Sequence, residues 1–429
     1  MAEERKPGLH TLSVHAGAKP DPTTGARATP IYQTTSYVFN SAEHAANLFG
    51  LREFGNIYTR IGNPTQTVLE ERVAALEGGT AALAVASGHA AQALTFHTLM
   101  MPGDEIVAAK KLYGGSINQL GHSFKSFGWG VKWADTDDLA SFEAAISPRT
   151  KVVFIESIAN PGGIVTDIEG IAKIAHKAGV PLVVDNTLAT PYLCRPFEHG
   201  ADIVVHSLTK FMGGHGNSIG GIIVDGGSFN WSAQGRYPLL SEPRPEYHGV
   251  KLHETFGNFA FAIACRVLGL RDLGAAISPF NAFLFITGIE TLPLRMQRHS
   301  DNALAVAKWL KDHADVTWVS YAGLPGDRYH NLAKRYCPKG AGAVLTFGVR
   351  GGHQAGVKVV ENAKLFSHLA NIGDTRSLII HPSSTTHSQL SEADRIAAGA
   401  GPDVVRLSVG IEDVEDIIAD LDQALKAAA

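Results

Sequence analysis

Three groups of residues that could act together chemically each follow an apolar segment of the chain. Lys210 comes just after "ADIVVHS" and is flanked by the hydroxyls of Ser207 and Thr209. Asp185 ends "PLVVD", and "SGH" at 87–89 follows "AALAV". A lysine amine can form a Schiff base, a buried carboxylate needs a cationic partner, and the N–H groups at a helix start bind phosphate. Pyridoxal phosphate (PLP) combines an aldehyde, a protonated ring nitrogen and a phosphate, so it would use all three groups.

Each of these residues also has an ordinary structural interpretation. Lys210 could be an exposed loop lysine, Asp185 a turn residue, and "SGH" a helix cap.

The motifs of nucleotide-binding proteins fit this sequence less well than PLP does. "GGHGNSIGG" has Ile219 where a dinucleotide loop needs its third glycine, and no G-x-x-x-x-G-K-[ST] motif occurs. The histidines lack zinc-site spacing, so we expect no metal.

The segments before these residues alternate between strand and helix patterns. Apolar runs at 81–87, 104–110, 150–157, 181–187, 201–207 and 220–226 predict strands, and 88–100 and 168–179 predict helices. Strands that are apolar on both faces, alternating with helices, are typical of a mainly parallel sheet in an α/β domain. Ligands of such sheets bind at the carboxyl ends of the strands, where the candidate residues lie.

The rest of the chain suggests three parts. Residues 1–62 are rich in turn-forming residues and predict an extended arm, 63–277 the α/β domain, and 278–429 a smaller C-terminal α+β domain. Within 226–275, residues 229–249 are loop-like and 259–274 could be helical. Residues 279–313 predict a long helix, or a kinked pair interrupted at Pro293.

Composition narrows the possible locations and partners. The net charge of -4 gives no field that would recruit nucleic acid or a membrane. The N-terminus is too polar for a signal peptide, and no apolar run is long enough for a membrane span. Three widely separated cysteines without a CxxC pair favour a reducing compartment, so we expect a cytoplasmic protein.

Several motifs in a fixed order resemble the Cys/Met-metabolism family of PLP-dependent enzymes. They are "YTRIGNPT", "ASGHAA", "LYGGS", "ESIANPGG", "DNT", "HSLTKF" and "VRLSVGIED", and they span nearly the whole chain. The resemblance implies the aspartate-aminotransferase-type fold (fold type I). It also implies a homo-oligomer, a homotetramer built as a dimer of dimers.

The resemblance assigns roles to individual residues. Lys210 would form the Schiff base and carry protons, and Tyr113 would stack on the cofactor ring as an acid or base near the leaving group. Arg406, with backbone near Ser377, would bind the substrate carboxylate. The remaining cofactor contacts would be Asp185 to the ring nitrogen, Thr187 to the ring, Asn160 to the phenolic oxygen, Ser87, Gly88, His89, Ser207 and Thr209 to the phosphate, and Tyr58 and Arg60 to the phosphate in the adjacent subunit.

Three features favour the members of this family that replace the acetyl group of O-acetylhomoserine by sulfide or another thiol. Gly115 stands where methionine γ-lyases carry a cysteine. The stretch "SLIIHPSSTTHSQL" at 377–390 has Pro382 where cystathionine-handling enzymes carry a glutamate, and the segment 226–275 lengthens the chain as in the sulfhydrylases. The alternatives are an O-succinylhomoserine sulfhydrylase or cystathionine γ-synthase, and further off a methionine γ-lyase or a PLP-binding protein without turnover.

Overall fold

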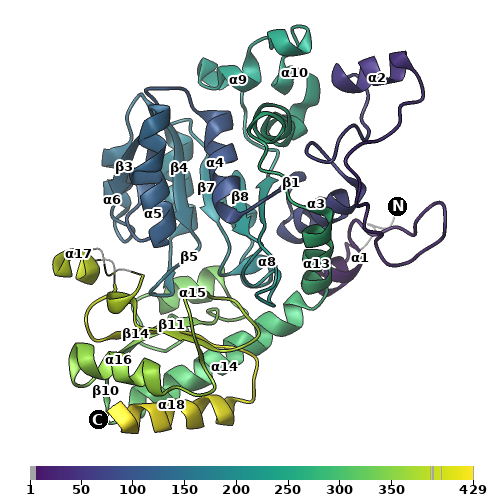
Figure 1. Ribbon diagram of the computed structural model, residues 1–429. Coiled ribbons are helices and arrows are strands. Elements are labelled where there is room, and N and C mark those ends of the chain that lie inside the picture. The colour runs from purple at the N-terminus through teal and green to yellow at the C-terminus, as the bar shows by residue number, and fades with distance from the viewer. Residues whose placement is uncertain (1–5, 387, 389–390, 398, 429) are drawn as a thin grey trace.

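The computed structural model describes residues 6–386, 388, 391–397 and 399–428, and two sheets organise them (Figure 1). The larger sheet has seven strands in the order β1-β9-β8-β7-β4-β2-β3. Its strands are β1 Ala81–Val85, β2 Glu105–Ala109, β3 Gly130–Ala134, β4 Thr150–Glu156, β7 Leu182–Asp185, β8 Ile203–Ser207 and β9 Gly221–Asp225. A two-stranded ribbon, β5 Ile158–Ala159 and β6 Ile164–Val165, follows β4.

The direction of the strands places the candidate residues at one edge of the larger sheet. Strands β8, β7, β4, β2 and β3 pair in parallel, whereas β9 runs antiparallel to both β8 and β1. Because β9 opposes both neighbours, β1 points the same way as β8. The carboxyl ends of β1, β2, β4, β7 and β8 therefore meet at one edge, and Ser87, Tyr113, Asp185 and Lys210 follow or end these strands.

A smaller sheet of five strands forms the core of the C-terminal part, in the order β10-β11-β14-β13-β12. Its strands are β10 Val316–Ser320, β11 Val344–Val349, β12 Ser367–His368, β13 Leu378–Ile380 and β14 Val404–Ser408. The long helix α14, Leu292–Asp312, runs from the larger part to this sheet, where it packs on β10 and β11 (Figure 1). Helices α16 Gly352–Asn362 and α18 Val414–Ala428 pack against each other beside it.

The other helices surround the larger sheet or connect the two parts. Helices that pack directly on the larger sheet include α3 (Pro64–Glu77) on β1 and β9, α4 (Gly88–Leu99) on β8 and β9, and α7 (Ile168–Lys177) on β7. These and the remaining helices are α1 Leu9–His15, α2 Ala42–Phe49, α3 Pro64–Glu77, α4 Gly88–Leu99, α5 Gly114–Gly121, α6 Leu139–Ala145, α7 Ile168–Lys177, α8 Thr190–Leu193, α9 Pro238–Ser241, α10 Leu252–Phe256, α11 Ala260–Ala264, α12 Arg271–Leu273, α13 Pro279–Glu290, α15 His330–Tyr336 and α17 Glu392–Ala397. Among the described residues, no helix combines the length and the apolar character that crossing a membrane requires.

Every strand predicted between 81 and 226 is present, as are the helices predicted at 88–100 and 168–179. The kinked pair is also confirmed, as α13 and α14. The break falls at Thr291, and Pro293 lies in the first turn of α14, where its missing N–H costs nothing. The sequence did not predict β3, an edge strand with partly exposed residues, nor helices α1 and α2 in the segment 1–62. The three domain boundaries remain a prediction.

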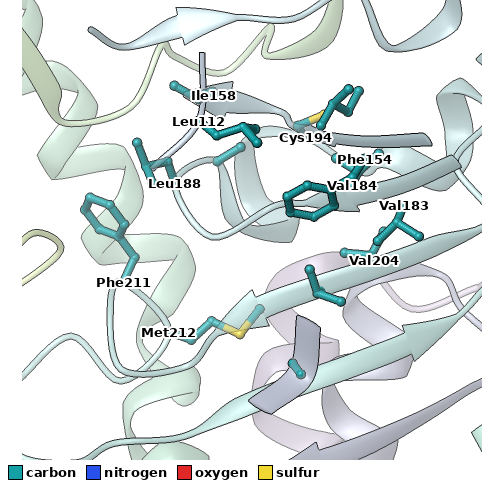
Figure 2. Packing of buried hydrophobic residues seen from close by; sticks show 14 of the residues in the cluster. Leu112, Phe154, Ile158, Val183, Val184, Leu188, Cys194, Val204, Phe211 and Met212 are labelled. Atoms are coloured by element: carbon teal, nitrogen blue, oxygen red, sulfur yellow. The ribbon is translucent and has the colours of Figure 1, made fainter. Parts of the chain in front are cut away.

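The core of the larger part lies between the sheet and the helices. Val183 and Val184 of β7, Val204 of β8 and Phe154 of β4 are fully buried, and their side chains pack in one cluster (Figure 2). Phe211 and Met212, which follow Lys210, extend this cluster toward the C-terminal part. The buried side chains of Phe211 and Met212 therefore anchor the loop directly after Lys210.

A buried arginine at the start of α14 fixes the same loop. Arg295 donates hydrogen bonds to the carbonyl oxygens of Phe211 (2.6 Å), Met212 (3.2 Å) and Gly288 (2.6 Å). Burial lowers the pKa of Arg295 to about 10. A guanidinium that satisfies three buried carbonyls couples the Lys210 loop to the junction of α13 and α14.

We expect Arg295→Met to lower the free energy of unfolding by about 3 kcal/mol, because it leaves these buried carbonyls without donors. Urea denaturation of the purified protein measures this. Arg298→Met, an exposed change on the same helix, should cost less than about 0.5 kcal/mol. Equal losses in the two variants would show that the buried contacts do not carry the effect.

Candidate active site

The edge of the larger sheet and the C-terminal part enclose a cavity of about 270 Å³. It unites most of the residues predicted from sequence to contact cofactor or substrate. Its walls include the predicted residues Ser87, Gly88, His89, Tyr113, Asn160, Asp185, Thr187, Ser207, Thr209, Lys210 and Arg406. They also include residues without a predicted role, namely Gln92, Glu156, Ile158, Leu188, Ile219, Ala370, Asn371, Ile372 and Thr386.

One end of the cavity offers hydrogen-bond donors for an anion. Ser87 caps helix α4, and its hydroxyl accepts from the N–H of Ala90 at 3.1 Å. The first N–H groups of a helix have no partner within it, so those of Gly88 and His89 remain available to a ligand. A Cβ at Gly88 would lie 2.8 Å from Cβ of Ser207, so only glycine allows this helix start to approach β8 so closely.

Asp185 is held in a fixed orientation beside these donors. One of its oxygens accepts from the N–H of Thr187 at 3.0 Å and from the Thr187 hydroxyl at 2.5 Å. The other accepts from the Gln92 amide at 3.2 Å, and Thr187 Oγ1 in turn accepts from the N–H of Ser207 at 2.9 Å. A carboxylate oriented in this way can face a cationic ring nitrogen. Gln92 was not predicted, because a glutamine inside a helix pattern carries no distinguishing signal.

Lys210 and Arg406 approach the cavity from the two different parts of the molecule. The Lys210 amine donates to Oδ1 of Asn371. Arg406 on β14 donates to Oδ1 of Asn160 and to the carbonyl of Asn371, both at 3.1 Å. Its Nε has no hydrogen-bond partner among the residues that the structure describes. Burial and the charge of Arg406 lower the pKa of Lys210 to about 8, and burial lowers the pKa of Arg406 to about 10.

Tyr113 is positioned by a carboxylate that was not predicted as a site residue. Glu156 at the end of β4 accepts from the N–H of Tyr113 at 2.7 Å and from the N–H of Asn160 at 3.2 Å. Burial and the charge of Asp185 raise the pKa of Glu156 well above its ordinary value. The Tyr113 ring stacks on His89, with centroids 5.9 Å apart and planes at 27°. Burial lowers the pKa of His89, which favours its neutral form.

Three predicted residues lie outside this cavity. Ser377 is buried and does not reach it, because its N–H and hydroxyl donate to Glu412 at 2.6 and 2.9 Å. The backbone beside Arg406 is that of Asn371 instead. Tyr58 and Arg60 lie elsewhere on the surface, where the guanidinium is 5.5 Å from the tyrosine ring centroid and donates to the carbonyl of Arg271. Their predicted contact belongs to a neighbouring subunit and remains a prediction.

The quoted stretch 377–390 lies partly inside and partly outside the described residues. Pro382 is buried at the start of a short 3₁₀ segment, and His381 bonds Ser384 and the carbonyl of Pro402, both at 2.9 Å. Thr386 lines the cavity. His387, Gln389 and Leu390 lie outside the described residues, so the structure does not test the resemblance of this stretch to the sulfhydrylases at these positions.

The arrangement fits PLP in three respects. Unpaired donors at the start of α4 suit its phosphate, Asp185 suits its ring nitrogen, and Lys210, whose lowered pKa favours the free amine, suits its aldehyde. The orphaned Nε of Arg406 in the same cavity leaves a donor for a substrate carboxylate. The fold and the site therefore define a PLP-dependent enzyme of fold type I.

Comparison with known proteins gives the family. Residues 10–426 match the model of the Cys/Met metabolism PLP-dependent enzymes, and the chain belongs to this family. It is 53% identical to an O-acetyl-L-homoserine sulfhydrylase of Leptospira meyeri, over 97% of this chain and 96% of the relative. It is 51% identical to a homocysteine synthase of Schizosaccharomyces pombe, over 98% of each chain.

A solved structure agrees with the fold and the cofactor. An O-acetylhomoserine (thiol)-lyase of Campylobacter jejuni, which carries a pyridoxyl-lysine phosphate, superposes with a TM-score of 0.95 and 41% identity. The match covers 98% of this chain and 100% of the other. The cofactor predicted from sequence, PLP, is therefore confirmed, and so is the predicted fold.

The pKa of Lys210 makes attachment of PLP to the apoprotein dependent on pH. Only the neutral amine attacks an aldehyde, so we expect the attachment rate to rise between about pH 7 and 9 and to level off above that. Absorbance of the Schiff base follows the rate, and borohydride reduction should add the cofactor's mass to Lys210. In Arg406→Gln the half-point should move to higher pH, because a neighbouring positive charge has been removed. A rate that stays flat across this range would contradict the assignment of Lys210.

Proposed function

We propose that this enzyme replaces the acetyl group of O-acetyl-L-homoserine by sulfide, giving L-homocysteine and acetate. The observation that carries the proposal is the cavity in which Lys210, Asp185, Tyr113 and Arg406 meet. Its support is the full-length similarity to relatives named O-acetyl-L-homoserine sulfhydrylase and homocysteine synthase.

In the proposed mechanism, the role of each residue follows from its position in the cavity. PLP, when bound, supplies a sink for the electrons left when a proton leaves the substrate Cα. Arg406 holds the substrate carboxylate through the donors that its present contacts leave free. Lys210 takes the proton from Cα and moves protons at Cβ, for which a pKa of about 8 is suitable. Tyr113, fixed through its backbone by Glu156, assists the departure of acetate from Cγ.

Gly115 provides a steric argument against the methionine γ-lyase alternative. A Cβ at this position would lie 2.4 Å from Cε1 of Tyr113 and 2.9 Å from Cε1 of His89. A cysteine there would have to displace the tyrosine ring from its place against His89. The Tyr113 position in this chain therefore depends on a glycine, and the residue that the γ-lyases carry is incompatible with it.

The proposal includes an oligomer in a cytoplasmic setting. Tyr58 and Arg60, which lie outside their own chain's cavity, would complete the phosphate site of a neighbouring subunit in a dimer, and two dimers would form a homotetramer. Exposed apolar side chains near them, such as Val38 and Phe54 at 96% and 72% exposure, suit such a contact. Three buried cysteines in the thiol form are compatible with a reducing compartment.

The first test mixes the protein and PLP with sulfide and either O-acetyl- or O-succinyl-L-homoserine, and quantifies homocysteine by mass spectrometry. We expect homocysteine mainly from the acetyl ester. Tyr113→Phe should lower turnover by roughly a hundredfold if the hydroxyl acts as an acid or base. Cystathionine formed from cysteine, with no homocysteine from sulfide, would instead identify a cystathionine synthase.

A subunit-mixing experiment tests the shared site. Lys210→Ala and Arg60→Ala should each be nearly inactive alone, since each lacks one part of every site. Random mixing by co-expression creates hybrid dimers in which one site has both intact residues, so about a quarter of wild-type activity should return. Mixing Lys210→Ala with Asp185→Ala supplies the control, because both residues serve the same chain's site and no activity should return. Equal results for both mixtures would disprove the sharing of Arg60.

A further inference from the structure

A second and larger cavity of about 570 Å³ opens beside the active site. The two cavities share Asn160 and Thr386 in their walls. Tyr113 lines the inner cavity, and the next two residues, Gly114 and Gly115, line the outer one. The tyrosine that would face the leaving group therefore stands at the boundary between them.

The outer cavity is far larger than the proposed reaction with sulfide requires. Sulfide has a single heavy atom and acetate has four, and even a water molecule occupies only about 30 Å³ in the liquid. The leaving group and the incoming thiol both act at the same substrate carbon, so they occupy the same space in succession. A space of this size next to Tyr113 can hold a considerably larger thiol.

The charged residues in the wall of the outer cavity are all cationic. Lys110 and Lys111 contribute to the lining, and no aspartate or glutamate is among the described residues that do so. Lys111 is already paired, with Asp137 at 2.5 Å and the Tyr329 hydroxyl at 3.0 Å. Lys110 is exposed, and its amine makes no hydrogen bond or ion pair with another described residue. Its charge is therefore free for a ligand.

The rest of the wall of the outer cavity contains both apolar and polar side chains. Leu112, Ile117, Ala159, Pro161, Ile164 and Ile396 give it an apolar part, and Asn118 and His122 a polar one. A ligand that suits both has an apolar body and an anionic end. A carboxylate at the far end of a thiol meets this description, with the sulfur directed toward Tyr113.

We propose that the outer cavity binds the thiol acceptor and that Lys110 selects acceptors that carry a carboxylate. This rests on the proposed function for its donor substrate. In the reaction the Cγ–O bond of O-acetylhomoserine breaks and its electron pair leaves with acetate. The sulfur lone pair forms the Cγ–S bond and the thiol proton passes to solvent, so the products are a thioether amino acid, acetate and a released proton. Lys110 is a specificity residue here and takes no part in bond breaking.

The test uses two thiols of nearly equal size, 3-mercaptopropionate and 3-mercaptopropanamide, with O-acetylhomoserine and the holoenzyme. Thioether formation is measured by mass spectrometry over a range of thiol concentrations. We expect a preference of about threefold in kcat/KM for the carboxylate, expressed in KM, which is the size of an ion pair that stays in contact with water. The preference should decrease as the salt concentration rises.

Variants of the lysine separate this effect from damage to the site. Lys110→Gln should abolish the preference and Lys110→Glu should reverse it. Lys125→Gln, an equal charge change at an exposed lysine outside the lining, should keep the wild-type preference.

Each outcome decides between the two proposals. Equal use of both thiols by the wild type, or a preference that persists in Lys110→Gln, would overturn the role of Lys110. Use of sulfide with rejection of both thiols would overturn the acceptor site while the proposed function stands. Thioether without homocysteine would retain the acceptor site and exclude sulfide as acceptor, and the absence of both products would remove both proposals.

Discussion

The active site depends on two cations, the buried Arg406 and the half-buried Lys210, which among the described residues are paired with amides and with no carboxylate. Lys210 donates to Asn371, and Arg406 donates to Asn160 and to the Asn371 backbone. Neutral acceptors satisfy the hydrogen bonds but do not neutralise the charges, so burial lowers both pKa values, to about 8 and about 10. A Lys210 amine that loses its proton more easily becomes a nucleophile. An arginine with no ion-pair partner in the described part of the chain remains ready for an anionic substrate.

This pairing requires the two sheets to be held closely together. Lys210 follows β8 of the larger sheet, whereas Arg406 lies on β14 of the smaller one. Arg295 fixes the Lys210 loop to the start of α14, which continues to the smaller sheet (Figure 1). At Gly373 the backbone has φ of +76°, and a Cβ would lie 2.7 Å from the N of Phe211. Only glycine permits the loop that carries Asn371 to approach the Lys210 segment this closely.

The residues that sequence could predict are those at the ends of recognisable strands. Lys210, Asp185 and "SGH" at 87–89 follow strongly apolar runs, and the parallel order of the sheet brings them together. Asn371 could not be predicted in this way, because it lies in an irregular loop whose position depends on packing between the two parts. The same packing places Ser377 outside the cavity, since its N–H and hydroxyl donate to Glu412 in the turn after β14. β3 was missed because its residues, most of them half-buried at the edge of the sheet, lack a continuous apolar pattern.

In the proposed reaction, the inner cavity carries the chemistry and the outer cavity carries the selectivity for the acceptor. In the inner cavity two carboxylates lie close together, and the pKa of Glu156 is raised by burial and by Asp185. Glu156 therefore binds a proton more readily, which limits the negative charge beside Asp185. These buried charges are needed whichever acceptor is used, because they act on the cofactor and on the amino-acid part of the substrate. The exposed Lys110 of the outer cavity takes no part in these contacts, so it can change without disturbing the buried charges. In the acceptor site proposed above, selectivity then varies at an exposed residue such as Lys110 while Lys210, Asp185 and Arg406 keep the same surroundings.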